Sequence, residues 1–337
     1  MLTEFAFTPS IFDEDAHEDK EAWRDQLKAL GYNMFPKVSA WPVIVSDLYA
    51  GSWNQIADQT VKAIKDQRAR ILCEGILQNM KKTLVTRPAC GNWPDEDIAW
   101  GREAIASTNV ESIERIVANS ASKSALLEEY RLIRSLDEVE GGGFWQGIGA
   151  ESSPKMIVAD QVQLLRKLCL HSDWLALISK DIYGGSDDET DFALGVIDLS
   201  LNRPADFGQV HFELHTEGPR RCVDEADYRV KAARVISAIS SSVKNNLKAS
   251  QSIDLLVWPK LLDRFLIAGT YTIESGGIKR KSPRWGVLLS HIARKPDEKK
   301  ADFFTEWKLL NRESLNRWFD KYASDSAANR PTPIRIT

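Results

Sequence analysis

The order of apolar and amphipathic stretches in residues 154–323 constrains the fold more than any other feature of this sequence. Short apolar runs such as "DWLALIS" (173–179) and "SIDLLVWP" (252–259) alternate with longer amphipathic stretches such as "DEADYRVKAARVISAISSSVKNNL" (224–247). Helices that alternate with short apolar strands are typical of α/β folds, in which the sheet is at least partly parallel. The sequence therefore predicts an α/β domain over residues 154–323, which ends in a long amphipathic helix over 297–324.

A glycine-rich stretch separates this domain from the first part of the chain. "EVEGGGFWQGIGAESSP" (138–154) holds five glycines and one proline, as a linker or an exposed functional loop would. The residues before it have mainly helical periodicity. We therefore expect a mainly helical N-terminal region over 1–140, a linker or loop over 141–153, and a loose tail over 324–337. The overall class is α/β, or α+β when both parts are counted. The stretch has neither GxGxxG nor GK[ST], so a phosphate cradle has little support and no cofactor is expected.

Composition limits the classes of protein that this chain can belong to. The net charge of −4 gives no global attraction to nucleic acid. The four cysteines form no CxxC pair, which argues against a cysteine-based zinc site. The chain has no signal-peptide pattern and no membrane-length apolar run, so we expect a cytoplasmic protein without a membrane partner.

The charge is unevenly distributed along the chain. Residues 1–30 carry eight acidic and three basic residues, whereas residues 271–337 carry fourteen basic and eight acidic residues. Such asymmetry indicates an anionic partner for the C-terminal part, or charged helix faces in solvent.

Polar residues that follow the predicted strands form the candidate site, because functional groups in open α/β sheets gather at the carboxyl ends of strands. These residues, with the basic cluster just before the last predicted strand, are Asp181, His215, Asp263, Arg264, His291, Arg294 and Lys295, and Lys279, Arg280, Lys281 and Arg284. Imidazole, carboxylate and cationic groups together suit phosphoryl chemistry: histidine attacks or moves a proton, and cations stabilise negative charge. Each group also has a structural interpretation, such as a turn aspartate, a salt bridge, a core histidine or a solvated basic loop.

"GQVHFELHTEGP" (208–219) raises a separate question, because alternate side chains of a strand face opposite ways. One face would carry His211, Glu213 and His215, as a metal site, a catalytic site or the wet side of an edge strand. His211 and His215 would lie about 13 Å apart along a straight strand, too far to share one ion. A metal site at His211 and Glu213 is thus the weaker alternative, and we favour His215 as the functional residue.

Two segments resemble a known family. "WLALISKDIYG" (174–184) resembles a strand that ends in Asp-Pro-Tyr, and "LLDRFLIAGTYTIESGG" (261–277) resembles a His-Asp-Arg-[Tyr/Phe] segment with a following glycine turn. This pattern is similar to the phospholipase-D-like α/β domain, found at the C-terminus of MIT-domain proteins and in some bacterial defence-associated proteins. Ile182 and Leu262 replace the proline and the histidine, and neither His215 nor His291 begins the active HxKxxxxD signature. The resemblance therefore implies a catalytically degenerate, binding version of the domain.

The resemblance and the basic C-terminal region together predict a component of a bacterial nucleic-acid-directed system, such as antiviral defence. The protein would bind nucleic acid or a partner protein, with phosphate contacts from the basic residues named above. One alternative is an active nuclease or phosphodiesterase that uses His215 and His291, with Asp263 nearby. Another is a structural adaptor subunit of a larger complex, whose tryptophan-rich helices dock on that complex.

Overall fold

The computed structural model describes residues 2–337 except 35–42, 50, 89–92, 95, 129, 142, 146–156, 183–187, 221, 249–250, 262–263, 274–278, 291–306 and 328, and the side chain of Lys279. The chain divides into two compact units, Met1–Ala150 and Glu151–Thr337. The division falls inside the glycine-rich stretch 141–153. Each unit contains its own sheet and helices, and the prediction of an α/β fold is confirmed.

The first unit contains a five-stranded parallel sheet besides its helices, which the helical periodicity of the sequence did not indicate. The strand order is β3-β2-β1-β4-β5, and all four pairings are parallel. The strands are β1 (Thr3–Phe7), β2 (Val43–Asp47), β3 (Leu84–Thr86), β4 (Arg115–Ala118) and β5 (Ile133–Ser135). They are short and covered on both faces, so they lack the alternation that marks a half-exposed strand.

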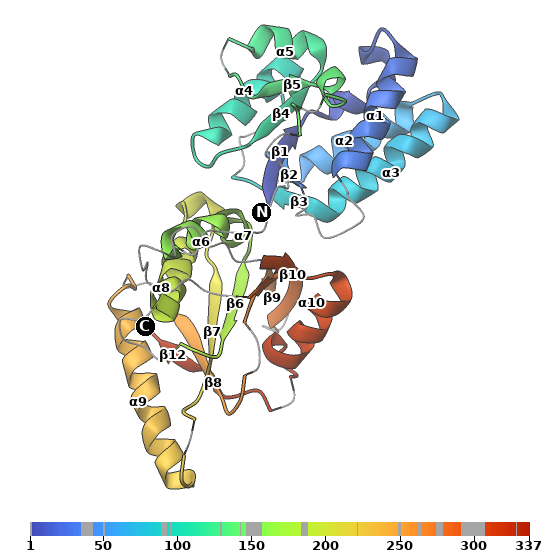
Figure 1. Cartoon of the computed structure of the whole chain (residues 1–337). Coiled ribbons are helices and arrows are strands. Elements are labelled where there is room, and N and C mark those ends of the chain that lie inside the picture. The colour runs from blue at the N-terminus through green and yellow to red at the C-terminus, as the bar shows by residue number, and fades with distance from the viewer. Residues whose placement is uncertain are drawn as a thin grey trace. The chain divides into compact units, whose positions relative to one another are not determined.

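Helices cover both faces of this sheet (Figure 1). Those on one side are α1 (Lys20–Met34), α2 (Ser52–Ala63) and α3 (Gln67–Thr83), and those on the other are α4 (Asp97–Thr108) and α5 (Ser120–Leu126). Phe5 and Phe7 pack into the core between the sheet and α1, α2 and α3. Ala6 faces the other side, where it packs with Trp100 of α4. This doubly wound arrangement follows from the crossover connections that parallel strands require.

The second unit contains a seven-stranded mixed sheet in the order β11-β10-β9-β6-β7-β8-β12. β6 (Trp174–Ser179), β7 (His211–Glu217) and β8 (Ile253–Trp258) are parallel neighbours. The strands that extend the sheet by antiparallel pairing are β9 (Phe265–Ile273), β10 (Lys279–Leu289), β11 (Trp307–Leu309) and β12 (Ile334–Ile336). The apolar runs at 173–179, 252–259 and 265–273 thus form strands, as their composition predicts.

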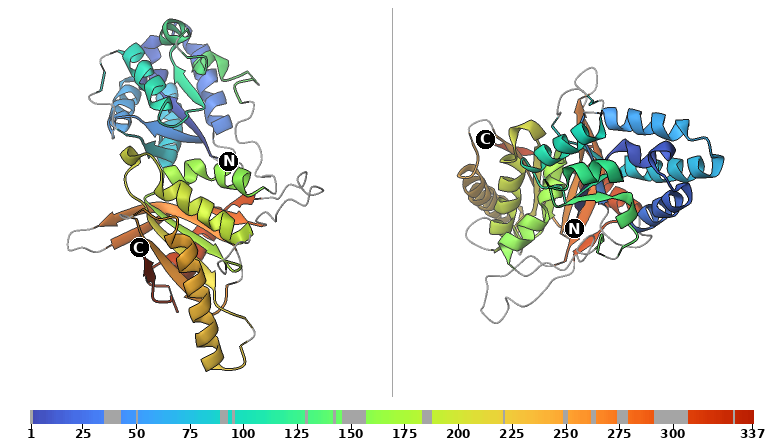
Figure 2. Two further views of the ribbon diagram at one scale, coloured as in Figure 1. Left: turned by 90° about the vertical axis from the view of Figure 1, so that its left-hand side faces the viewer. Right: turned by 90° about the horizontal axis from the view of Figure 1, so that it is seen from above.

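Five helices accompany this sheet among the described residues. They are α6 (Val158–Leu164), α7 (Arg166–Leu170), α8 (Asp188–Leu201), α9 (Glu225–Lys244) and α10 (Arg312–Trp318). Figure 1 places α8 and α10 on opposite sides of the sheet, and Figure 2 shows that α9 extends beyond the end of the sheet. Leu315 of α10 and Tyr322 pack on β6, β8 and β9, where they contribute to a core with Trp174, Leu256 and Phe265.

The C-terminal part differs from the sequence prediction in two respects. The described part of residues 297–324 is not one long helix: it forms β11, α10 and a π turn over Phe319–Ala323. Residues 324–337 are not a loose tail, because β12 pairs with β8 and Ile336 is buried. Within the described residues, no helix has the length and apolar character needed to cross a membrane.

Candidate functional site

The polar face of β7 is buried in the middle of the second sheet. β7 lies between β6 and β8, so it is not the edge strand that a solvated polar face would require. Phe212 and Leu214 face the opposite side from His211, Glu213 and His215, as the alternation in the sequence predicts. His215 is fully buried and Glu213 is 1% exposed, and both lie inside β7 rather than at its end.

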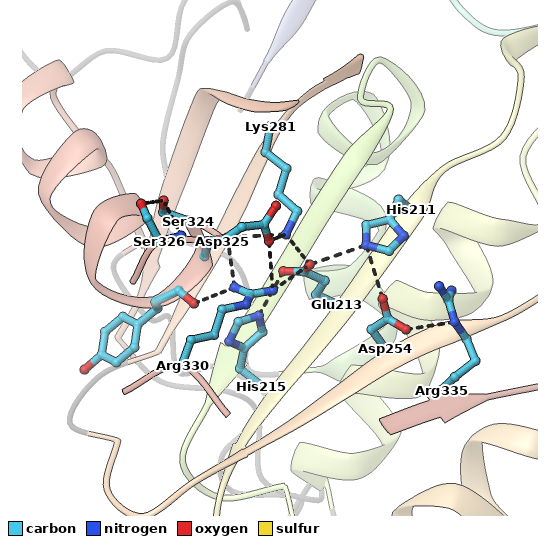
Figure 3. Close-up of polar contacts among 12 residues, drawn as sticks. His211, Glu213, His215, Asp254, Lys281, Ser324, Asp325, Ser326, Arg330 and Arg335 are labelled. Atoms are coloured by element: carbon cyan, nitrogen blue, oxygen red, sulfur yellow. Dashed lines mark hydrogen bonds and ion pairs between the residues drawn. The ribbon is translucent and has the colours of Figure 1, made fainter. Parts of the chain in front are cut away.

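Glu213 is the centre of an ion cluster (Figure 3). Its Oε1 lies 2.6 Å from Lys281 Nζ and 2.9 Å from Arg330 Nη2. His211 lies 3.4 Å from Oε1, and His215 lies 3.3 Å from Oε2. Burial acts to raise the pKa of Glu213, but hydrogen bonds from the two histidines and the charge of Lys281 outweigh it and hold this pKa well below its usual range. Glu213 is therefore a carboxylate at neutral pH.

The hydrogen bonds of His215 fix its tautomer. Trp258 Nε1 donates to His215 Nδ1 at 3.1 Å, so Nδ1 carries no proton. The proton of the neutral ring then lies on Nε2, which donates to Glu213 Oε2. Burial lowers the pKa of His215 and favours this neutral form. Both ring nitrogens are engaged and the side chain has no exposed surface, so substrate cannot reach His215 in this conformation.

His211 belongs to a second branch of the same cluster. Its Nε2 lies 3.4 Å from Asp254 Oδ2, its ring stacks on Tyr271, and Arg335 Nε lies 2.9 Å from Asp254 Oδ1. His211, Glu213 and Asp254 each offer a ligand atom within 4.8 Å of the other two, a donor set that suits a divalent ion. However, Lys281 and Arg330 already contact Glu213 Oε1, and an ion would have to displace these two cations. The ligand types fit a metal, but the surrounding charges do not.

Lys281 connects β10 to the C-terminal segment 319–336. Its Nζ lies 2.6 Å from Asp325 Oδ1 as well as 2.6 Å from Glu213, and it lies 5.7 Å from the centre of the Trp174 ring. Arg330 donates to the main-chain carbonyls of Tyr322 and Ala323. The cluster therefore holds this segment over the polar face of β7. The interpretation of the basic cluster Lys279–Arg284 as a solvated loop before the strand needs correction, because these residues belong to β10 and the side chain of Lys281 is 4% exposed.

A second polar cluster lies beyond the carboxyl ends of β6 and β7. Asp181 is in direct contact with Arg264, which also lies 2.8 Å from Glu189. Arg220 lies 2.8 Å from Glu217 and 3.6 Å from Asp181. The structure thus brings Asp181 and Arg264 together, as ion-pair partners. The described contacts of this cluster do not include His215.

The other residues selected from the sequence have different environments. Arg284 lies over the Trp285 ring at 4.3 Å, and burial lowers its pKa to about 10. Arg280 is exposed on β10. Asp263, His291, Arg294 and Lys295 lie outside the described residues. The backbone of Lys279 belongs to β10, and its side chain lies outside the description.

Sequence reasoning missed four members of the first cluster: Asp254, Asp325, Arg330 and Arg335. Asp254 had a signal, since it is the one charged residue inside the apolar run "SIDLLVWP". The other three belong to a segment whose composition is typical of a surface tail. The sequence matches no protein-family model and no curated protein, so the site has to be interpreted from its own geometry.

Proposed function

We propose that this protein is a non-catalytic nucleic-acid-binding protein, and that the basic C-terminal part of its second unit contacts the phosphates. The burial of His215 carries the choice of binding over catalysis. A histidine that attacks phosphorus or moves a proton must reach the substrate, whereas both nitrogens of His215 are engaged inside the fold. The phospholipase-D-like resemblance, with its incomplete active signature, supports the same choice.

Exposed cations beside a half-buried aromatic ring provide the binding surface. Arg317 lies over the Trp318 ring at 5.2 Å, and Lys321 lies 4.9 Å from the same ring. Both cations are exposed, and neither has an ion-pair partner within the part of the chain that the structure describes. The Trp318 ring packs on Phe265 and Tyr322 and holds the two cations at the surface. Cations pair with phosphates, so this Trp318 patch (Arg317, Trp318 and Lys321) suits the backbone of a nucleic acid. In contrast, Lys281 and Arg264 are neutralised by internal carboxylates.

A salt series of binding measurements tests this proposal. We expect labelled single-stranded DNA or RNA to bind with an affinity that falls as salt rises, by fluorescence anisotropy. The slope of log K against log salt is negative, and each phosphate contact to a single strand contributes about 0.7 to its magnitude. Arg317→Gln combined with Lys321→Gln should therefore reduce that magnitude by about 1.4. Lys244→Gln with Lys248→Gln is the matched control, since it removes two exposed cations from the same unit, and it should leave the slope unchanged.

The same experiment separates the alternatives. Equal effects of both double variants would show that the patch is wrong, and absence of binding would overturn the proposal in favour of a protein-binding adaptor. Cleavage with or without Mg²⁺ or Mn²⁺ that His215→Ala abolishes would establish the nuclease instead. A place in a bacterial antiviral defence system, which the family resemblance implies, is part of the same proposal.

A further inference from the structure

Helix α9 carries apolar residues on two opposite sides, and one of these sides faces solvent. The helix extends beyond the end of the sheet (Figure 2). One side carries Ala232, Ile239 and Val243, which are buried. On the other side Val230 is 54% exposed, and Val223, just before the helix, is 91% exposed. Large apolar side chains that are bare on a protruding helix indicate a contact surface.

Val230 lies at the centre of this outward face of α9, which consists of Ala226, Val230, Ala233 and Ser237. These residues follow one another at spacings of four, three and four, so they share one side of the helix, and all four are exposed. The face contains no charged residue. Its side chains are short, so a second helix can approach it closely.

The charges beside this face match a second copy of the same helix. Asp227 lies three residues before Val230 and Arg234 lies four residues after it, on the same border of the face. Asp227 Oδ2 accepts from Lys231 Nζ and from the main-chain N–H of Val223, whereas its Oδ1 makes no hydrogen bond among the described residues. Arg234 is exposed and makes no ion pair within the described part of the chain.

We propose that the outward face of α9 joins two copies of this chain, whose helices pair antiparallel about a two-fold axis at Val230. In such a pair each residue before Val230 faces one that lies about equally far after it in the second copy. Ala226 then packs on Ala233 of the second copy, and Asp227 Oδ1 accepts from its Arg234. The contact is about three turns long, so we expect a weak and reversible dimer. This dimer does not depend on nucleic-acid binding.

Sedimentation equilibrium of the full chain over a concentration series tests the dimer. We expect the average mass to rise from one chain toward two as the concentration rises. Val230→Glu should raise the dissociation constant about tenfold or more, because two like charges would face each other across the axis. Val110→Glu makes the same change at a valine of the first unit that is 42% exposed, and it should have no effect. A monomer at every concentration, or a dimer that Val230→Glu does not weaken, would overturn the proposal.

Disulfide cross-linking tests the antiparallel arrangement. The background is Cys222→Ser, which removes a partly exposed thiol and serves as the blank. Val230→Cys puts two thiols at the axis, and diamide treatment should yield a covalent dimer. Ser241→Cys is the matched control, since Ser241 is exposed on the same side of α9 but its two copies would lie about 33 Å apart. Equal cross-linking of both variants would indicate parallel helices, and cross-linking of neither would indicate no contact at Val230; each result would overturn the proposal.

Discussion

Replacement of Glu213 by glutamine tests whether the buried cluster holds the second unit together. The substitution keeps the shape of the side chain and removes its charge. Lys281 and Arg330, whose side chains are 4% and 9% exposed, then lose their buried counter-charge. Among the described residues, the carboxylate that Lys281 keeps is that of Asp325, which is 58% exposed and well solvated.

The expected loss follows from the burial of the partners. Removal of one member of a buried ion pair costs about 3–5 kcal/mol, because the other member remains as an uncompensated buried charge. Here the amide oxygen of glutamine still accepts hydrogen bonds, and Asp325 still pairs with Lys281. We therefore expect Glu213→Gln to lower the free energy of unfolding of the second unit by about 3 kcal/mol, the low end of that range.

Urea unfolding measures this loss, and hydrogen exchange with mass spectrometry assigns the transition to peptides from β7 and residues 307–337. The assignment is necessary because a chain of two units need not unfold in one step. Glu225→Gln is the control, since Glu225 pairs with Arg229 on α9 at 3.2 Å with both side chains more than 70% exposed. It should have no measurable effect. If Glu213→Gln lowered the free energy of unfolding by less than about 1 kcal/mol, as for a surface pair, the ion cluster around Glu213 would not hold the second unit together.

Three further predictions follow from burial and packing. Burial lowers the pKa of His215 below its ordinary value of 6.5, so the folded state loses stability as the pH falls below 6.5. In urea titrations, His215→Gln should make the free energy of unfolding depend less on pH. An unchanged dependence on pH would contradict this prediction. In the same assay Gly269→Ala should lower the free energy of unfolding by about 1–3 kcal/mol, because its Cβ would overlap the main chain of β10. Gly75→Ala, in open space on α3, should raise it by about 0.5–1 kcal/mol. Burial raises the pKa of Cys73 to about 12, so peptide mass spectrometry after iodoacetamide treatment should find Cys222 alkylated before Cys73. Faster labelling of Cys73 would show that its burial is wrong.

The sequence predicted the second sheet better than the first for a physical reason. The runs that became β6, β8 and β9 are six to nine residues long and bounded by turn residues. Strands β3 and β5 of the first unit have three residues each, too few for a period to register. Long amphipathic helices such as α3 dominate the signal there, and the sheet that they cover becomes visible only from tertiary pairing.

The candidate site could be predicted only in part, because its members are distant in the sequence. Alternation along 211–215 correctly placed His211, Glu213 and His215 on one face. Lys281 lies 68 residues from Glu213, and Arg330 lies 117 residues from it. No local pattern reports such contacts. For the same reason, the sequence could not show why a central strand such as β7 has a polar face. Cations from β10 and the C-terminal segment neutralise Glu213 on that face.

The placement of Glu213 explains the fold of the C-terminal segment. A carboxylate on a central strand cannot be solvated, so it requires cations from other parts of the chain. Arg330 provides one of them only if residues 319–336 cross the sheet, and Asp325 strengthens this crossing through Lys281. Any substrate that reached His215 would first have to break these contacts, at the cost of leaving Glu213 uncompensated. Two histidines around a glutamate look catalytic in the sequence, whereas in the structure the glutamate binds the cations that hold residues 319–336 over β7.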